Sequence, residues 1–281
     1  MRFGHFAFLS ICCASAFAVL ADDSSRTVAL SETPVAVQKT VNARVGDGKL
    51  GDIDKSLSSG ETVYDVGLTT KDGQERDFTV AEDGTLLNTE VALAEIPAAV
   101  QKTIQAQAEG WGLESIDKNL DDSEISYDVE VSKDGRKKSF TVDEGGTLLS
   151  AEITLAETPA AVQKTVRAQV SDGKLKGIDE MFDDDGVTYD AEVTSKDGHD
   201  RAFTVGPDGR LLSEEVTLDA VSPAARKTIK EEIGDGKILR IDKALVEKQQ
   251  GVLPYEVQGR KDGKPFDFSV GPRGKFLGMT N

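Results

Sequence analysis

The sequence has little of what covalent cross-linking and nucleophilic catalysis require. Its two cysteines, Cys12 and Cys13, lie close to the start of the chain, and its two histidines are His5 and His199. Residues 22–281 therefore contain no cysteine that could form a disulfide, and zinc binding through histidine or cysteine clusters is excluded there. The stability of this region must come from the burial of apolar side chains.

A long hydrophobic run is also missing. The longest apolar segment begins at Phe6 and is shorter than the roughly 20 apolar residues that a membrane-spanning helix needs. A basic residue precedes it, and small residues followed by acids end it, a layout typical of a secretory signal peptide. We predict a signal peptide at residues 1–21, with Ala18 as an alternative end. Lipidation at Cys12 is disfavoured by the bulky Ile11 before it, so we expect a periplasmic or secreted protein without a membrane span.

Positive charge is scarce as well. The chain has 33 lysines and arginines against 50 aspartates and glutamates, a formal net charge of −17. Such a surface repels a phosphate backbone and anionic lipid headgroups, which excludes nucleic acid and makes a membrane surface an unfavourable partner. The excess of acids either serves solubility or attracts a basic protein partner.

What the sequence does have is repetition. The phrase "AETPAAVQKTVRAQV" begins at Ala156, and close relatives of it begin at Ala94 and Ser31. Four prolines stand in register at spacings of 62 to 64 residues, namely Pro34, Pro97, Pro159 and Pro223. We define repeats 1 to 4 as residues 31–93, 94–155, 156–218 and 219–281. Because the repeats fill nearly all of the chain after residue 21, no segment remains for a separate catalytic domain.

Each repeat has the pattern of a helix followed by antiparallel strands. In repeat 3, Thr158 is placed to cap a helix that starts at Pro159, and Val162, Val166 and Val170 form one apolar stripe. Alternating segments such as "VTYDAEV" and "AFTV", separated by "KDG", predict a β-hairpin. The irregular spacing in "KLGDID" predicts a β-bulge in an earlier strand. The sequence thus predicts an α+β fold of four tandem two-layer units, each with one α-helix packed on a 3–4-stranded antiparallel sheet.

The same segments carry a family resemblance. In repeat 3 they read "PAAVQKT", "DGKLKGID", "TYDAEVTSKDG" and "FTVGPDGRLL", and this order resembles the PepSY-like family, also called β-lactamase-inhibitor-like. Repeat 4, with "SPAARKTIK", matches least well. The resemblance implies a helix packed on an antiparallel sheet, export from a bacterial cell, and a non-catalytic binding or inhibitory module. Inhibition of a β-lactamase does not follow, because the shared motif is a folding motif and the inhibitor's cysteines have no counterpart here.

Few residues stand out as candidates for chemistry. In "MFDDDGVTYDAE", Asp183, Asp185 and Glu192 have the spacing of EF-hand positions 3, 5 and 12, which predicts a Ca²⁺ site, although Met181 occupies position 1. A solvated acidic turn is the alternative interpretation. A Ser/His/Asp set would depend on His199, which we interpret as an exposed residue of a hairpin turn.

Candidate contact residues come from the strands. Asp65, Asp128 and Asp190 alternate with the apolar residues of the predicted strands, so we expect them on the sheet face that the helices leave uncovered. Trp111, the only tryptophan, follows the second predicted helix and either contacts a partner or caps that helix.

The sequence favours an exported, non-catalytic binding module that engages, or inhibits, another extracytoplasmic protein through its sheet faces. An acidic Ca²⁺-binding envelope protein is the alternative, and a carboxylate-dependent hydrolase is a third hypothesis. We expect no cofactor and no enzymatic activity, and a partner that is an unidentified protein, basic if the acidic face is the contact surface.

One test concerns the predicted strand faces. Replacement of Phe203 by alanine should remove an aromatic side chain from beneath the third helix and lower the free energy of unfolding by about 3–5 kcal/mol. The Asp200→Ala variant, changed in the preceding turn, should lose little. Denaturant unfolding of both variants measures the difference, and equal losses would show that the two strand faces had been exchanged.

Overall fold

A computed structural model describes residues 25–58, 61–120, 125–183, 186–247, 252–261 and 264–280. The predicted signal peptide at residues 1–21, with Cys12 and Cys13, lies outside the described residues. The described chain divides into two units, which we call the N-terminal unit (residues 25–149) and the C-terminal unit (residues 150–280); β9, which begins at Leu148, crosses this boundary and is counted with the C-terminal unit.

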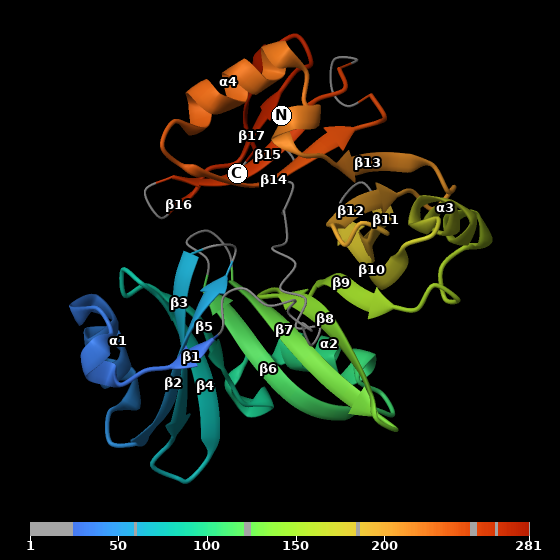
Figure 1. The fold of residues 1–281 in the computed structure, drawn as a ribbon. Helices are drawn as coiled ribbons and strands as arrows, with labels where there is room; N and C mark the ends of the chain where they lie inside the picture. Colours follow the sequence, from blue (N-terminus) through green and yellow to red (C-terminus); the bar gives the residue numbers. More distant parts are fainter. Residues whose placement is uncertain are drawn as a thin grey trace. The chain divides into compact units, whose positions relative to one another are not determined.

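The N-terminal unit contains eight strands and two α-helices (Figure 1). In chain order these are β1 (Arg26–Thr27), α1 (Val35–Val45), β2 (Lys49–Ser58), β3 (Glu61–Thr69), β4 (Glu75–Ala81), β5 (Leu86–Glu90), α2 (Ala98–Gln107), β6 (Gly112–Leu120), β7 (Ile125–Lys133) and β8 (Arg136–Asp143). Each strand pairs antiparallel with the next, from β1 through to β8. The unit is therefore one meandering sheet with two helices inserted between its strands.

The C-terminal unit follows the same plan. Its elements are β9 (Leu148–Ile153), α3 (Ala160–Val170), β10 (Lys174–Asp183), β11 (Gly186–Thr194), β12 (Asp200–Val205), β13 (Leu211–Glu215), α4 (Pro223–Ile233), β14 (Lys237–Ala244), β15 (Tyr255–Lys261), β16 (Lys264–Pro265), β17 (Phe268–Val270) and β18 (Phe276–Met279). Antiparallel pairing runs from β9 to β15, continues through β17 to β18, and adds β16 beside β15.

The prediction of four tandem two-layer α+β units is wrong. The last strand of repeat 1 pairs with the first strand of repeat 2 through Asn88–Asn119 and Glu90–Asp117, and β13 pairs with β14 in the same way. The strands of a unit thus form one continuous antiparallel sheet and not separate helix-on-sheet units. The physical reason is that each repeat taken alone would end in a strand with unpaired backbone groups, and the next repeat satisfies them.

Strand alternation places one side of each sheet against the helices. In repeat 1, Val37 and Val41 of α1 pack with Tyr64, Val66 and Phe78 of the sheet. The equivalent phenylalanine is buried in every repeat, at Phe78, Phe140, Phe203 and Phe268. The prediction that Phe203 lies in the core is confirmed, since its exposed fraction is 0%.

The helix starts differ in part from the prediction. Thr158 does not cap α3; its hydroxyl donates a hydrogen bond to the carbonyl of Leu155, 2.9 Å away, and the helix begins after Pro159 without a side-chain cap. At the start of α4, by contrast, Ser222 is a cap, since its side-chain oxygen accepts a hydrogen bond from the backbone N–H of Ala225. Thr158 behaves otherwise because a tight turn before the helix offers its hydroxyl a nearer carbonyl.

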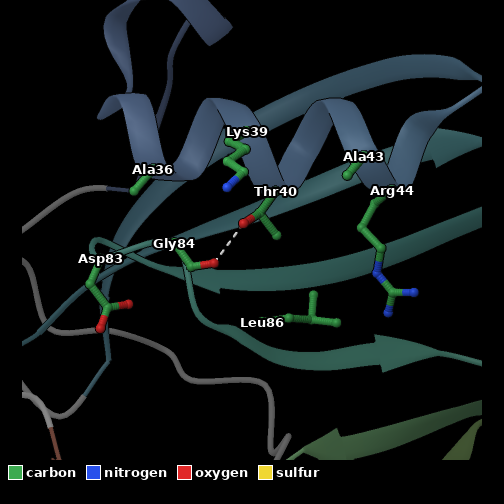
Figure 2. Close-up of a pocket in the computed structure, with 8 residues that line it drawn as sticks. All are labelled: Ala36, Lys39, Thr40, Ala43, Arg44, Asp83, Gly84 and Leu86. Atoms are coloured by element: carbon green, nitrogen blue, oxygen red, sulfur yellow. Dashed lines mark hydrogen bonds between the residues drawn. The ribbon is translucent and has the colours of Figure 1, made fainter.

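The threonine of the repeated phrase ties each helix to a hairpin turn. Figure 2 shows the hydroxyl of Thr40 on α1 directed at the carbonyl oxygen of Gly84, and this hydrogen bond is 2.6 Å long. Equivalent bonds join Thr103 to Gly146, Thr165 to Gly209 and Thr228 to Gly274. Gly84 has φ +89°, and a Cβ built on it would lie 2.8 Å from the backbone of Ala36. The phrase therefore encodes a close contact between helix and turn.

A pair of glycine substitutions tests this contact. Gly209 (φ +82°) and Gly198 (φ +85°) both have left-handed backbone, but a Cβ on Gly209 would lie 2.7 Å from the carbonyl of Ala161, whereas nothing lies within 4 Å of one on Gly198. Gly198→Ala should cost about 1 kcal/mol of backbone strain. Gly209→Ala should cost about 1–3 kcal/mol more, because the helix must move away. Thermal unfolding of both variants would contradict the contact if the losses were equal.

Candidate functional site

The sheet face opposite the helices carries pairs of carboxylates on neighbouring strands. Asp65 of β3 lies between the core residues Tyr64 and Val66, so its side chain is on the other face, and its register partner on β2 is Asp54. The same arrangement occurs in every repeat, and we call the residues the acid pairs: Asp54–Asp65, Asp117–Asp128, Asp179–Asp190 and Asp242–Glu256. Like charges directly opposite on adjacent strands destabilise a sheet. Hydrogen bonds and one ion pair offset part of this cost, as those of Thr79 with Asp65 and Arg240 with Asp242 do.

Sequence reasoning found one member of most pairs and missed the other. Asp65, Asp128 and Asp190 were predicted on the uncovered face, and alternation does place them there. Their partners belong to the segments "GDID", "ESID", "KGID" and "LRID", in which an aspartate follows an isoleucine in all four repeats. This recurrence was the available signal. It was hard to use because a β-bulge lies just before it, and the register shift between Leu50 and Ile53 confirms the predicted bulge in repeat 1.

Polar neighbours hold the second member of each pair in the N-terminal unit. Asp128 accepts hydrogen bonds from the side-chain amide of Asn119 and from the hydroxyl of Thr141, both at 2.7 Å. Asp65 accepts one from the hydroxyl of Thr79, also at 2.7 Å. These bonds fix the orientation of the carboxylates, and burial raises the pKa of Asp128 in spite of them.

The carboxylates around Asp117 are less well compensated. Glu90 of β5 is the register partner of Asp117, and the backbone N–H of Asp77 on β4 donates to Glu90 Oε2 at 3.3 Å. Burial, followed by the charges of Glu90 and Asp128, raises the pKa of Asp117 to about 6. Within the described residues no lysine or arginine forms an ion pair with Asp77, Glu90 or Asp117. We call Asp65, Asp77, Glu90, Asp117 and Asp128 the N-terminal acid face.

The C-terminal unit has a cation at the corresponding place. Arg240 of β14 lies with its Nε 2.7 Å from Asp242 Oδ2 and its Nη2 2.8 Å from Asp242 Oδ1. Burial acts to lower the pKa of Arg240, but the charges of Asp242, Asp190 and Glu215 outweigh it and raise that pKa. Only 6% of the Asp242 side chain is exposed, so the arginine compensates a carboxylate that water hardly reaches.

Among the described residues, the other acid pair of this unit, Asp179–Asp190, forms no ion pair with a lysine or arginine. Burial, followed by the charges of Glu152 and Asp190, raises the pKa of Asp179 to about 7. Burial also raises the pKa of Asp190, whose Oδ1 is buried without a hydrogen-bond partner in the described part of the chain. Burial therefore favours the protonated form of both carboxyls of this pair.

The structure does not bring the predicted Ca²⁺ ligands together. Asp183 ends β10 opposite Gly186, whereas Glu192 lies near the other end of the hairpin, opposite Gly177, and forms an ion pair with Lys176 at 2.6 Å. Asp185 lies outside the described residues. Among the residues that are described, no group of three histidine, cysteine or acidic side chains is placed to hold a metal ion.

The two remaining candidate residues are Trp111 and His199. Trp111 follows α2 and is half-buried, with Lys138 Nζ 4.7 Å from the centre of a ring. His199 is exposed at a hairpin turn, as predicted. A shallow depression of about 400 Å³ beside α1, lined by Lys39, Arg44, Asp83 and others, lies where the helix meets the turn of Gly84 (Figure 2). Both basic side chains at its rim belong to α1, on the helix side of the sheet and away from the acid pairs.

The solved structures that resemble this chain do so with low sequence identity and low TM-scores. No family model and no curated protein matches the sequence. Similar solved structures include a DUF2874 family protein from Bacteroides ovatus (17% identity, 42% of this chain and 84% of that one, TM-score 0.32). A BLIP-like protein from Bacteroides fragilis has 18% identity, with 42% and 84% of the two chains covered and a TM-score of 0.31. A Bacteroides vulgatus protein of unknown function, assigned to the periplasm, has 19% identity, 45% and 97% coverage and a TM-score of 0.29.

The helices in the ranges that the structure describes could not cross a membrane, because each is too short or too polar to span a bilayer.

The raised pKa of Asp179 predicts how stability depends on pH. The folded chain holds a proton on this carboxyl up to about pH 7, whereas an unfolded chain releases it near its ordinary value of 3.8. The folded state thus binds more protons between these values, and the free energy of unfolding should fall as pH rises through this window. Asp179→Asn should flatten that fall and raise stability near pH 8 by about 1–3 kcal/mol.

A carboxyl shifted the other way provides the control. Lys176, and then Thr194, hold the pKa of Asp200 below its ordinary value, so Asp200→Asn should leave the fall between pH 4 and 7 in place. Denaturant unfolding at a series of pH values measures both variants. An unchanged slope in Asp179→Asn would show that other groups cause it.

Proposed function

We propose that the protein is an exported, non-catalytic binding module that engages another extracytoplasmic protein through the sheet face that carries the acid pairs. The observation that carries the proposal is the presence of an acid pair in each of the four repeats, on the face opposite the helices. Two carboxylates directly opposite on neighbouring strands repel each other, so a contact that they make with another molecule is a natural reason for their repetition.

The distribution of the carboxylates supports binding and not turnover. Hydrolysis by two carboxylates requires one acid and one base that converge on a single bond in a sheltered site. Here the acids are spread along the strands of each sheet, and several are held by fixed hydrogen bonds, as Asp128 is by Asn119 and Thr141. Such a surface attracts a partner of opposite charge and fixes its orientation.

Export rests on the predicted signal peptide at residues 1–21. The periplasmic or secreted location that it implies is also the location assigned to the similar structure from Bacteroides vulgatus. Membership of the PepSY-like family, and the division of the chain into repeats at residues 31–93, 94–155, 156–218 and 219–281, belong to this proposal too. The proposal extends to inhibition of the bound protein, which can be assayed directly once the capture experiment has identified that protein.

The first experiment is capture of a partner from an envelope extract on the immobilised chain, followed by kinetic analysis of the purified pair. The wild-type association rate should fall as salt rises through the physiological range, since the acid face steers a basic partner. Asp77→Lys, an exposed substitution on the N-terminal acid face, should lower the association rate by about 3–10-fold at low salt, with little change in melting temperature.

Glu109→Lys is the matched control. Glu109 is exposed after α2, so the net charge changes equally while the acid face stays intact. A partner whose association ignores salt and responds equally to both variants would contradict the proposal. Saturable hydrolysis of a substrate that is lost on substitution of one carboxylate would replace it with the hydrolase hypothesis.

A further inference from the structure

Two positions in the two units are equivalent but hold different side chains. Ser115 in β6 follows a register shift after Leu113, and Arg240 in β14 follows the same shift after Ile238. Each then precedes the isoleucine and aspartate of an acid pair. Because the bulges coincide, the serine of repeat 2 occupies the place of the arginine of repeat 4.

The carboxylates around the two positions also correspond. Arg240 lies in the field of Asp242, Glu215 and Asp190. Their counterparts in the N-terminal unit are Asp117, Glu90 and Asp65, by strand and register. The match extends to a backbone detail: the N–H of Ala202 donates to Glu215 Oε2 at 3.0 Å, just as the N–H of Asp77 donates to Glu90 Oε2 at 3.3 Å.

The N-terminal acid face differs from its counterpart by two charges. It lacks the guanidinium, because Ser115 stands at the position of Arg240, and it has one more carboxylate, because Asp77 stands at the position of Ala202. In the C-terminal unit the chain supplies its own cation to this set of acids. In the N-terminal unit the described residues give Asp117, Glu90 and Asp65 no ion pair; Lys137 on this side of the sheet pairs instead with Glu130, the register partner of Ser115.

We propose that the N-terminal acid face binds an arginine side chain of a basic protein partner at the position that Arg240 fills in the C-terminal unit. The inference rests on the proposed function and names the chemistry of the partner at one site. The independent observation is that the carboxylate equivalent to Asp117, Asp242, already binds a guanidinium within this chain through two atoms.

Guanidinium fits this site better than a metal ion does. A planar guanidinium presents five donors and reaches carboxylates spread over several strands, whereas Ca²⁺ needs six to eight oxygens converging at 2.3–2.6 Å. No such convergent group of acids exists among the residues described. Lysine would offer a single charged point and could not reproduce the two-atom contact that Arg240 makes with Asp242.

Binding should also respond to pH. Asp117 must be ionised to receive the guanidinium, and Glu90 of β5, Asp128 of β7 and Asp77 of β4 are the charged groups that oppose its ionisation. Affinity should therefore rise as pH is raised through about 6.

The test is a titration of the full mature chain, residues 22–281, with the peptide acetyl-Gly-Arg-Gly-amide, followed by backbone NMR shifts. Shifts should concentrate at residues 115–119 and 126–130. Ser115→Arg places a guanidinium of the chain itself at the site and should weaken peptide binding at least about tenfold, while the lysine peptide should bind the wild type more weakly than the arginine peptide. Equal binding to Ser115→Arg, or equal binding of the lysine peptide, would overturn the proposal.

The reciprocal variant makes the test symmetric. Arg240→Ser should open a second arginine-peptide site in the C-terminal unit, with shifts at residues 240–244. If removal of this half-buried cation unfolds that unit, the Ser115→Arg titration still decides the question. Ca²⁺ that binds the wild type and is excluded by Ser115→Arg would assign the position to a metal ion and overturn the inference.

Binding of the captured partner to the two variants distinguishes failure of the arginine site from failure of the proposed function. A partner whose binding is weakened by Asp77→Lys but not by Ser115→Arg would support the acid face as a contact surface and overturn the arginine site. An arginine-peptide site that Ser115→Arg abolishes, in a chain that captures no envelope protein through this face, would support the site and overturn the proposed function.

Discussion

The backbone hydrogen bonds between β5 and β6, and between β13 and β14, are the interaction on which the rest of the structure depends. They join the last strand of one repeat to the first strand of the next and so remove an edge from each. Because pairing is antiparallel and in fixed register, the apolar residues of both repeats remain on one side of the sheet and the acid pairs on the other. A single pairing thus produces both the shared helix-covered side and the shared carboxylate side.

Hydrophobic periodicity predicted the individual elements well and their assembly poorly. The alternation around Tyr64 and Phe203 reports which face of a strand is buried, and both residues are buried. It carries no information about which strand lies beside an edge, since backbone groups are the same in every residue. The prediction of separate two-layer units at residues 31–93 and 94–155 was therefore wrong, because Asn88 and Glu90 of repeat 1 pair with a strand of repeat 2.

The site was predictable to a similar degree. Asp65 and Asp128 could be placed on the uncovered face because they alternate with core residues. Their partners Asp54 and Asp117 could not be placed with confidence in register, because a bulge of unspecified length interrupts β2 and β6 just before them. The role of Arg240 depends on the same bulge, since only the structure shows that it stands where repeat 2 has Ser115.

The proposed arginine site makes the difference between Ser115 and Arg240 a matter of valency. A chain in which both acid faces were open could bridge two partners, or hold one partner at two points and gain avidity from the second contact. Arg240 closes one of these faces from within through Asp242. On the proposed arginine site the protein would be a monovalent receptor, because Arg240 stands at the equivalent position of the C-terminal unit, and the residues at positions 115 and 240 would separate a one-to-one binder from a cross-linker.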